Sequence, residues 1–339
     1  MHTNVYVAGF PSVYGGADTE LDHTLDLLLE HGISITLVPF RTVDTALQQK
    51  TEQRGLRIAP YSNRVFVNQT VISYCNGSFL RALPTIARCG PPRKVIWLNC
   101  MTRTFPDEVL AHREGWIDCF GFQTEYQESL IRPVLEKIRP VTTFPYRPYV
   151  NISRMRWAYR DWHGTYNVGR ISRDDPAKFS RDTWRIFDRI LVPRRLKKKV
   201  FILGYGRRAA QKLGKPPPGL DWMTWPPRGI ETDAFFARVD TMVHKTGGSR
   251  ENYPRVLVEA YSYGTVPIVE DDYAFPRLVQ HGITGFRTSC SDEMSYYASW
   301  LAGNPSAHRR MAEKGRAYLD DELNDREASW RGWETVLGP

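Results

Sequence analysis

The sequence predicts an α/β protein of two domains, each a parallel β-sheet with helices on both faces. The chain has 339 residues, which is more than one hydrophobic core usually supports, and its 42% of apolar residues is enough for two cores. It opens with a strand, an amphipathic helix and a second strand, at residues 4–9, 20–31 and 33–39. This order favours parallel pairing, because the helix carries the chain back to the edge where the first strand began.

The same alternation continues along the chain. Further strands are predicted at residues 64–67, 71–74, 95–98 and 119–123, and then at 166–168, 200–203, 241–243 and 266–269. Residues 145–163 are rich in aromatics and contain two prolines, so we expect them to link an N-terminal domain at 1–150 to a C-terminal domain at 151–321. Trp330, Trp333 and Leu337 share one helical face, which predicts a last helix at residues 322–337.

Composition bounds the environment and the partners. The five cysteines are odd in number and lack C-x-x-C spacing, which favours a reducing compartment and argues against a disulfide framework or a zinc site. No apolar run approaches 18 residues and no signal peptide is evident, so we expect a cytoplasmic protein without a membrane span. The net charge of +9 is concentrated in residues 151–215, where 18 Lys and Arg face 5 Asp and Glu. Such clustering indicates an anionic partner, which can be a phosphate ligand, nucleic acid or an acidic membrane.

The most informative segment is residues 249–286, which holds Glu251 and Glu259. Residues 255–263 predict a helix that Pro254 can begin and Gly264 can end. Glu251 then lies in the loop before the helix and Glu259 lies about a turn and a half inside it. Because a helix N-terminus favours phosphate and carboxylates accept hydrogen bonds from sugar hydroxyls, the segment indicates a diphosphate ligand that carries sugars.

This segment resembles the C-terminal motif of glycosyltransferase family 4. The matching positions are Glu251, Glu259, Ala260, Gly264, Pro267, Pro276, Val279, His281, Gly282, Thr284 and Gly285. The chain departs from the family at Asn252-Tyr253-Pro254, where Gly-Phe-Gly is usual. The resemblance implies a retaining, metal-independent enzyme of the GT-B type, with two Rossmann-like domains whose parallel sheets face each other across a cleft. It also implies that the last helix, within 322–339, returns to the N-terminal domain.

Two loops after predicted strands bear on the leaving group. Gly15-Gly16 can present backbone N–H groups to a phosphate, although a Gly-Gly pair alone more often makes a tight turn. Arg170, Arg173 and Lys178 follow the first strand of the second domain, and they can equally pair with the neighbouring aspartates on a solvated turn. The resemblance assigns Gly15-Gly16 to the donor diphosphate, and the basic residues to neutralising it as it leaves.

A third loop supports a rival interpretation. Gly204, Gly206 and Ala209 satisfy the dinucleotide fingerprint G-x-G-x-x-A, which would suit an NAD-dependent oxidoreductase. The loop follows the second strand of its domain, however, and no acidic residue lies at the required distance. The resemblance instead places this loop at the nucleotide of the donor. Further candidate donor contacts are Tyr205, Thr224, His244, Asn252 and Tyr253. No Asp-x-Asp, H-E-x-x-H or paired-cysteine motif occurs, so we expect no metal and no cofactor beyond the sugar nucleotide as co-substrate.

The acceptor is less well defined. The family's first-domain histidine has no clear match, and Asn76 or Asn99 can take its place. Arginines alternate with aromatic residues from 145 to 170, and this mixture suits a nucleic acid. Arg154, Arg156, Trp157 and Arg160 are the candidate contacts. An interdomain linker that packs its aromatics and leaves its arginines in solvent would look the same.

The small size and basic balance are similar to those of phage enzymes that glucosylate hydroxymethylated bases in DNA. Glucose transfer from UDP-glucose to such a base is therefore the first functional hypothesis. A surface polysaccharide or a lipid-linked acceptor is the alternative within the same enzyme class, and a non-catalytic nucleic-acid-binding protein is an alternative outside it. The basic run at residues 194–199 is either a solvated turn or part of a wider electrostatic surface. The sequence leaves the oligomeric state open.

Overall fold

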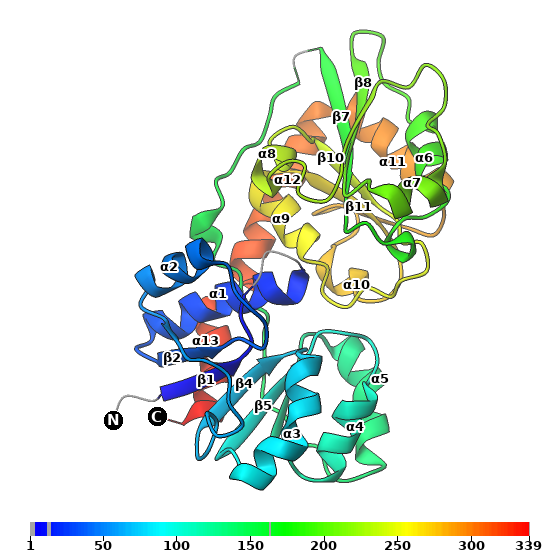
Figure 1. Cartoon of the computed structure of the whole chain (residues 1–339). Coiled ribbons are helices and arrows are strands. Elements are labelled where there is room, and N and C mark those ends of the chain that lie inside the picture. The colour runs from blue at the N-terminus through cyan, green and yellow to red at the C-terminus, as the bar shows by residue number, and fades with distance from the viewer. Residues whose placement is uncertain (1–3, 12–14, 163, 339) are drawn as a thin grey trace. The chain divides into compact units, whose positions relative to one another are not determined.

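The computed structural model describes residues 4–11, 15–162 and 164–338, and the chain divides into two compact units (Figure 1). Unit 1 comprises Met1–Asn151 and Asn324–Pro339, and unit 2 comprises Ile152–Leu323. Each unit contains one six-stranded sheet in which every pair of neighbouring strands is parallel. The predicted fold class is therefore confirmed.

The sheet of unit 1 has the strand order β3-β2-β1-β4-β5-β6. Its strands are β1 (Asn4–Ala8), β2 (Ser34–Val38), β3 (Arg57–Ile58), β4 (Thr70–Tyr74), β5 (Lys94–Asn99) and β6 (Cys119–Phe122). The helices of this unit are α1 (Gly16–Glu30), α2 (Thr45–Gln53), α3 (Gly77–Cys89), α4 (Pro106–Arg113), α5 (Glu125–Glu136) and α13 (Arg326–Leu337). One face of the sheet packs on α1 and α13, and the other packs on α3, α4 and α5.

The sheet of unit 2 has the strand order β12-β11-β10-β7-β8-β9. Its strands are β7 (Thr165–Ile171), β8 (Lys197–Leu203), β9 (Trp222–Trp225), β10 (Thr241–His244), β11 (Val266–Glu270) and β12 (Phe286–Thr288). The helices are α6 (Thr183–Arg189), α7 (Arg207–Leu213), α8 (Thr232–Phe236), α9 (Arg255–Tyr263), α10 (Phe275–Leu278), α11 (Ser291–Gly303) and α12 (Pro305–Tyr318). Short turns of 3-10 helix lie at η1 (Ile152–Arg154) and η2 (Pro176–Lys178), and a π-helical turn lies at η3 (Leu319–Leu323).

The two sheets share one topology. Counted within its own unit, each follows the order 3-2-1-4-5-6 of Rossmann folds. The strand order reverses between β1 and β4 in unit 1, and between β7 and β10 in unit 2. Open parallel sheets bind ligands beyond the carboxyl ends of the strands at such a reversal. Each unit therefore has one edge at which a ligand site is expected.

The strand predicted at residues 64–67 is wrong. This segment forms successive turns, in which Val65 and Val67 donate to carbonyls three residues back, at 3.2 Å each. Its apolar character serves packing, because Phe66 is buried against Phe79, with ring centroids 5.6 Å apart. The strands β3, β9 and β12 were not predicted. All three are short and lie at sheet edges, where the apolar pattern is weakest.

The last helix, α13, belongs to unit 1 and begins four residues later than the sequence pattern predicted. Its start is set by Asp325, whose carboxylate accepts from the backbone N–H of Ala328 at 2.9 Å. Trp333 is fully buried against Phe144 and Tyr146, at centroid distances of 5.2 and 5.7 Å. The neighbouring Gly332 allows this approach, because a Cβ there would overlap with the carbonyl oxygen of Pro145.

Replacing Trp333 with Ala should lower the free energy of unfolding by about 3–5 kcal/mol, the range for truncating a buried aromatic side chain. Trp330 lies on the same helix but is only partly buried, stacked on His31 at 4.0 Å, so Trp330→Ala is the matched control and should cost less. Urea unfolding followed by circular dichroism measures both. Equal losses in the two variants would mean that Trp333 does not anchor the helix.

Candidate functional site

Charged side chains converge at the carboxyl ends of β7 and β10, where the strand order of unit 2 reverses. Arg170 lies near the end of β7 and His244 is the last residue of β10. Lys178 ends η2 in the loop after β7, and Glu251 lies in the loop after β10. The structure thus brings together four of the predicted site residues from two parts of the sequence.

The two loops are held to each other by backbone hydrogen bonds. The N–H groups of Gly247 and Ser249 both donate to the carbonyl of Ala177, at 2.8 and 3.0 Å. Gly247 makes this approach possible, because a Cβ there would overlap with the carbonyl oxygen of Phe179. Lys212 bridges the same loops by donating to the carbonyls of Pro176 at 2.6 Å and Gly247 at 3.0 Å. The position of Lys178 relative to Glu251 is therefore fixed by the backbone.

Glu251 is 6% exposed, and Lys178 donates to its Oε1 at 2.7 Å. Burial alone would raise the pKa of Glu251, but His244 and Lys178 outweigh it and hold this pKa at about 2. The Nε2 of His244 lies 3.7 Å from the same oxygen, which is an electrostatic contact too long for a hydrogen bond. Glu251 is therefore ionised at neutral pH and keeps acceptor capacity on its second oxygen.

Arg170 is 1% exposed, and its guanidinium contacts the loop that carries Lys178. It donates to the carbonyls of Lys178 and Ile171 and to Nδ1 of His244. Burial lowers the pKa of Arg170 to about 10, so it stays charged at neutral pH. Because Nδ1 of His244 accepts a hydrogen bond, the proton of its neutral ring belongs on Nε2, which faces Glu251. Burial, followed by the charge of Arg170, lowers the pKa of His244 to about 4.

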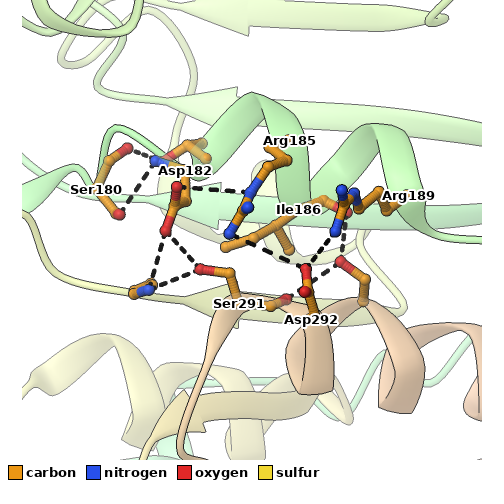
Figure 2. A network of polar contacts seen from close by, with 10 residues as sticks. Ser180, Asp182, Arg185, Ile186, Arg189, Ser291 and Asp292 are labelled. Atoms are coloured by element: carbon orange, nitrogen blue, oxygen red, sulfur yellow. Dashed lines mark hydrogen bonds and ion pairs between the residues drawn. The ribbon is translucent and has the colours of Figure 1, made fainter.

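The hydrogen bond between Ser291 and Asp182, at the starts of two helices (Figure 2), also holds the residue after His244. Lys245 donates to Asp182, at the start of α6, at 3.1 Å and contacts the hydroxyl of Ser291, at the start of α11, at 2.6 Å. Ser291 in turn donates to Asp182 at 2.6 Å, and this hydrogen bond, together with Lys245, lowers the pKa of Asp182. The loop that carries Glu251 is thus anchored to α6 and α11 as well as to η2.

Helix α9 has the bounds that the sequence predicted, and Gly264 ends it in a left-handed conformation with φ of 79°. Pro254 is its N-cap, and its first turn contains no acidic residue. Glu259 is partly buried on this helix, and burial raises its pKa while Arg255 opposes the rise. Asn252 is buried and Tyr253 is partly buried beside Glu251 in the chain. The donor-binding roles of Glu259, Asn252 and Tyr253 stay predictions.

The geometry of the third loop disfavours the dinucleotide interpretation. Asp174 accepts from the backbone N–H groups of Ala209 at 2.7 Å and Arg208 at 3.3 Å, so a carboxylate of the chain itself occupies the N-terminus of α7. Gly206 packs against the same side chain, where a Cβ would overlap with it. A pyrophosphate cannot take that position without displacing Asp174. In the same loop Gly204 has φ of 92° and packs on the carbonyl of Ser172.

The remaining donor candidates of unit 2 lie around this loop. The hydroxyl of Tyr205 donates to the carbonyl of Gly214 at 3.0 Å, and Arg173 is exposed. Thr224 lies on the edge strand β9. Its neighbour Trp225 stacks on Phe201 at 5.8 Å, as a core residue does. Of these residues, Arg173 is the one with a charged side chain.

Unit 1 has a cavity of about 1000 Å³ at its own strand reversal. It is lined by the ends of β1, β2 and β4 and by the first turns of α1 and α3, among them Phe10, Asp18, Phe40, Arg41, Tyr74, Asn76 and Arg81. The side chain of Asn76 caps α3 through the N–H groups of Ser78 and Phe79 and donates to the carbonyl of Ala8, so it serves the fold. Gly15 is the N-cap of α1 and Gly16 is its first residue.

Asn99 is fully buried and also serves the fold. Its amide donates to Glu108 at 2.9 Å and to the carbonyl of Arg103 at 2.9 Å, and its oxygen accepts from Met101 at 2.8 Å. Burial raises the pKa of Glu108 to about 7. These partners account for Asn99 without a ligand.

The basic segment is only partly available to an anionic partner. Arg160 forms a two-point ion pair with the buried carboxylate of Asp240, at 3.1 and 2.6 Å, and donates to Thr165 at 3.2 Å. Arg154, Arg156 and Trp157 are exposed, and Trp157 stacks on Tyr159 at 6.2 Å. The structure therefore gives Arg160 a role in the fold, and the other three keep the exposure that the hypothesis requires.

Several residues of this site had no signal in the sequence. The sequence indicates Asp174 only as a possible partner of the neighbouring basic residues, and it does not indicate Glu270, which accepts from the N–H of Thr246 at 3.1 Å. In unit 1, Glu20 is fully buried and accepts from Tyr146 and Gln123. The position of Glu270 at the end of a predicted strand next to β10 was the one clue available, because strand ends meet at one edge.

In the described part of the chain, no group of three or more His, Cys, Asp or Glu side chains is arranged to hold a metal ion, and no helix is long and apolar enough to cross a bilayer.

The sequence matches no protein-family model and no curated protein. Solved structures share the fold. Anabaena Alr3699/HepE in complex with UDP and glucose superposes with a TM-score of 0.69 at 15% identity, over 99% of each chain. S. aureus TarM gives 0.77 at 10% identity, over 100% of this chain and 99% of that one. A glycosyltransferase from Rickettsia africae gives 0.70 at 10% identity, over 99% and 98%. The protein therefore has the GT-B fold of these glycosyltransferases.

Arg170→Ala should destabilise the protein by at least about 2 kcal/mol, because each buried acceptor that loses its donor costs about 1–3 kcal/mol. Arg173→Ala is the control from the same loop, and it should change the free energy of unfolding by no more than about 0.5 kcal/mol, since Arg173 is exposed. Urea unfolding at pH 7 measures both. Equal stability of the Arg170 variant and the native protein would contradict the structural role given to its guanidinium.

His244 should make the protein less stable as the pH falls. Its pKa of about 4 in the folded state is below its ordinary value of 6.5, so the unfolded chain binds the proton more tightly between these values. The loss from pH 7 to pH 5 is expected to be about 2 kcal/mol, at about 1.4 kcal/mol per pKa unit. Glu251 does not contribute in this window, because its stabilising effect is lost only as the pH falls from about 4.5 towards 2.

Unfolding free energies of the native protein and of His244→Gln at pH 7 and pH 5 test this expectation. The variant should lose about 2 kcal/mol less than the native protein over that interval. His308 is also buried with its pKa lowered to about 3, but it is present in both proteins and cancels in the comparison. An identical pH dependence in the two proteins would show that His244 is not held neutral.

Proposed function

We propose that the protein is a retaining glycosyltransferase of family 4, which moves a sugar from a nucleotide-diphosphate sugar to an acceptor hydroxyl. The observation that carries the proposal is the Lys178–Glu251 pair at 2.7 Å, held at the strand reversal of unit 2 above the buried Arg170 and His244. A cation for a diphosphate and a carboxylate for sugar hydroxyls are thus adjacent. The GT-B fold supports the same conclusion.

The chemistry follows from the charges. The bond between the anomeric carbon and the diphosphate oxygen breaks, so positive charge develops on the sugar and negative charge on the leaving group. Lys178 and Arg173 stabilise the leaving diphosphate, and Glu251 accepts hydrogen bonds from the donor sugar. The acceptor oxygen bonds to the anomeric carbon from the face that the diphosphate leaves, and the acceptor proton passes to a diphosphate oxygen. Arg170 is a positioning residue, because it reaches the site only through Lys178 and His244.

UDP-glucose is the first donor to test, because HepE was solved in complex with UDP-glucose and superposes over 99% of both chains. For the acceptor we propose a hydroxymethylated base in DNA. Arg154, Arg156 and Trp157 are exposed and suited to a phosphate backbone, although Arg160 is committed to Asp240. The unit 1 cavity of about 1000 Å³ has room for a base that has left the helical stack. A polysaccharide or lipid-linked acceptor belongs in the same panel.

Glu251→Gln should reduce transfer and donor hydrolysis by at least about tenfold to a hundredfold, because it removes a charge-assisted acceptor for the sugar while preserving the shape of the side chain. Lys178→Met should reduce the rate by about 10²–10³, as expected for the loss of one donor to developing negative charge. Glu313→Gln, an exposed acid on α12, is the control and should be active. UDP release from UDP-glucose, with and without each acceptor, measures the rate.

The acceptor panel contains hydroxymethylated duplex DNA, unmodified duplex DNA, an oligosaccharide and a polyprenyl phosphate-linked sugar. EDTA should have no effect, because the sequence contains no Asp-x-Asp motif. Full activity of Glu251→Gln at saturating donor would overturn the donor-site assignment. A change in NADH fluorescence on mixing, without hydrolysis of any sugar nucleotide, would favour the oxidoreductase instead. Transfer only to the oligosaccharide or the lipid-linked sugar would overturn the DNA acceptor and leave the donor chemistry standing.

A further inference from the structure

Three exposed apolar side chains of unit 2 lie near the point where α6 ends. Leu191 is 74% exposed in the loop after α6, and Tyr296 and Trp300 on α11 are 62% and 38% exposed. The latter two are four residues apart and therefore lie on one face of the helix. Leu191 is next to them, because its backbone N–H donates to the hydroxyl of Ser299 at 2.8 Å.

This surface is ordered. Lys198 donates to the carbonyls of Phe187, Asp188 and Ile190 at 2.7–2.8 Å, which closes the C-terminal end of α6. Arg189 pairs with Asp292 at the start of α11 at 2.6 Å, and Arg185 lies 4.0 Å from the same carboxylate (Figure 2). Arg189 and the backbone N–H of Leu191 thus each connect the end of α6 to α11. The exposure of the Leu191 side chain is therefore not a result of fraying at the end of α6, because the backbone of Leu191 is hydrogen-bonded to Ser299.

Exposed basic residues follow Leu191 in the chain. Arg194, Arg195 and Lys197 follow Leu191 within six residues, and all three are exposed. Within the described ranges, no carboxylate pairs with any of them. The exposed acidic residues of α6 and α11 near these side chains are Asp188, Asp292, which pairs with Arg189, and Glu293, which accepts from Ser289. The basic run that the sequence left as either a solvated turn or an electrostatic surface therefore borders an exposed apolar cluster.

We propose that this surface, formed by Leu191, Arg194, Arg195, Lys197, Tyr296 and Trp300, binds the face of an anionic lipid bilayer. Transfer of a leucine side chain from water to an apolar phase is favourable, and Tyr and Trp side chains favour the boundary between headgroups and acyl chains. Lys and Arg beside them attract anionic headgroups. The phosphates of a nucleic acid would attract the basic side chains, but a nucleic acid offers no apolar phase to Leu191. A bilayer therefore fits the whole surface better.

The surface lies away from the proposed donor site. Leu191 to Lys197 lead into the amino end of β8, whereas Arg170 and His244 lie at the carboxyl ends of β7 and β10. Parallel strands place these ends at opposite edges of the sheet. Attachment through this surface leaves the donor loops open to solvent, and the inference does not depend on the proposed glycosyl transfer.

Co-sedimentation with vesicles tests the proposal. The full-length protein should bind vesicles of phosphatidylcholine with 30% phosphatidylglycerol and bind pure phosphatidylcholine at least about tenfold more weakly, since each basic residue near an anionic surface contributes about fivefold. Arg194→Glu/Arg195→Glu should lower binding to the mixed vesicles by about 30-fold or more. Lys50→Glu/Lys314→Glu makes the same change in net charge at exposed positions on α2 and α12, and it should leave binding within about twofold of native.

The apolar part is tested separately. Leu191→Ser/Tyr296→Ser should weaken binding to the mixed vesicles by at least about tenfold, because both side chains lose apolar area that would enter the bilayer. Met223→Ser, at another exposed apolar position of unit 2, is the matched control and should bind normally. Both replaced residues are mostly exposed, so the far-UV circular dichroism should be that of the native protein.

Duplex DNA in the same buffer separates the two anionic partners. If Arg194→Glu/Arg195→Glu lowers DNA binding while Leu191→Ser/Tyr296→Ser leaves vesicle binding unchanged, the surface is a nucleic-acid site and the proposal fails. No binding of the native protein to the mixed vesicles at low salt also overturns it. The proposal holds if the charge and the apolar variants each reduce vesicle binding and both controls do not.

Discussion

The buried guanidinium of Arg170 is the constraint on which the rest of the site depends. A cation that is 1% exposed requires hydrogen-bond acceptors, and the chain supplies them from the carbonyls of Lys178 and Ile171 and from His244. Two consequences follow from these bonds. The turn η2 is drawn over the end of β7, which brings Lys178 to Glu251, and the neutral tautomer of His244 is selected. The buried charge therefore holds the turn that carries the cation, and backbone hydrogen bonds from Gly247 and Ser249 hold the loop of Glu251 against that turn.

The electrostatic balance at this edge favours an anionic ligand. Arg170 and Lys178 are positive and Glu251 is negative, while burial keeps His244 neutral and raises the pKa of Glu270. Two cations, Arg170 and Lys178, thus lie beside the ionised carboxylate of Glu251. Because Arg170 is satisfied by carbonyls and an imidazole, it contributes field without being neutralised by an ion pair. The proposed glycosyl transfer requires such an arrangement, with cations to stabilise a leaving diphosphate and a carboxylate beside them to hold the sugar.

The sequence was sufficient for the fold class and for α9, because these depend on local signals. Alternating apolar segments determine parallel sheets, and Pro254 and Gly264 mark both ends of the helix that follows Glu251. It was insufficient where a residue's role depends on a distant partner. The sequence pattern around Arg160 is that of a phosphate ligand, but in the structure Arg160 pairs with Asp240, which is 80 residues away. Likewise, nothing in the local sequence indicates that Asp174 accepts from the N–H of Ala209 in α7, 35 residues later. The strand predicted at residues 64–67 was wrong for a related reason, because apolar residues are buried in turns as well as in strands.

The repeated topology gives each unit one strand reversal, and the two reversals differ in their lining. Both sheets follow the same strand order, so each has a reversal where loops gather, and in the described residues the reversal of unit 2 brings together the buried Arg170, His244 and Glu251. The reversal of unit 1 has instead an open cavity with Phe10, Phe40 and Tyr74 among its walls, together with Arg41 and Arg81. A site that polarises a bond must exclude water and fix its charges, whereas one that admits varied hydroxyl compounds benefits from room and aromatic surface. The basic and apolar surface for which bilayer binding is proposed lies at the opposite edge of the unit 2 sheet, so substitutions there leave the buried network around Arg170 intact.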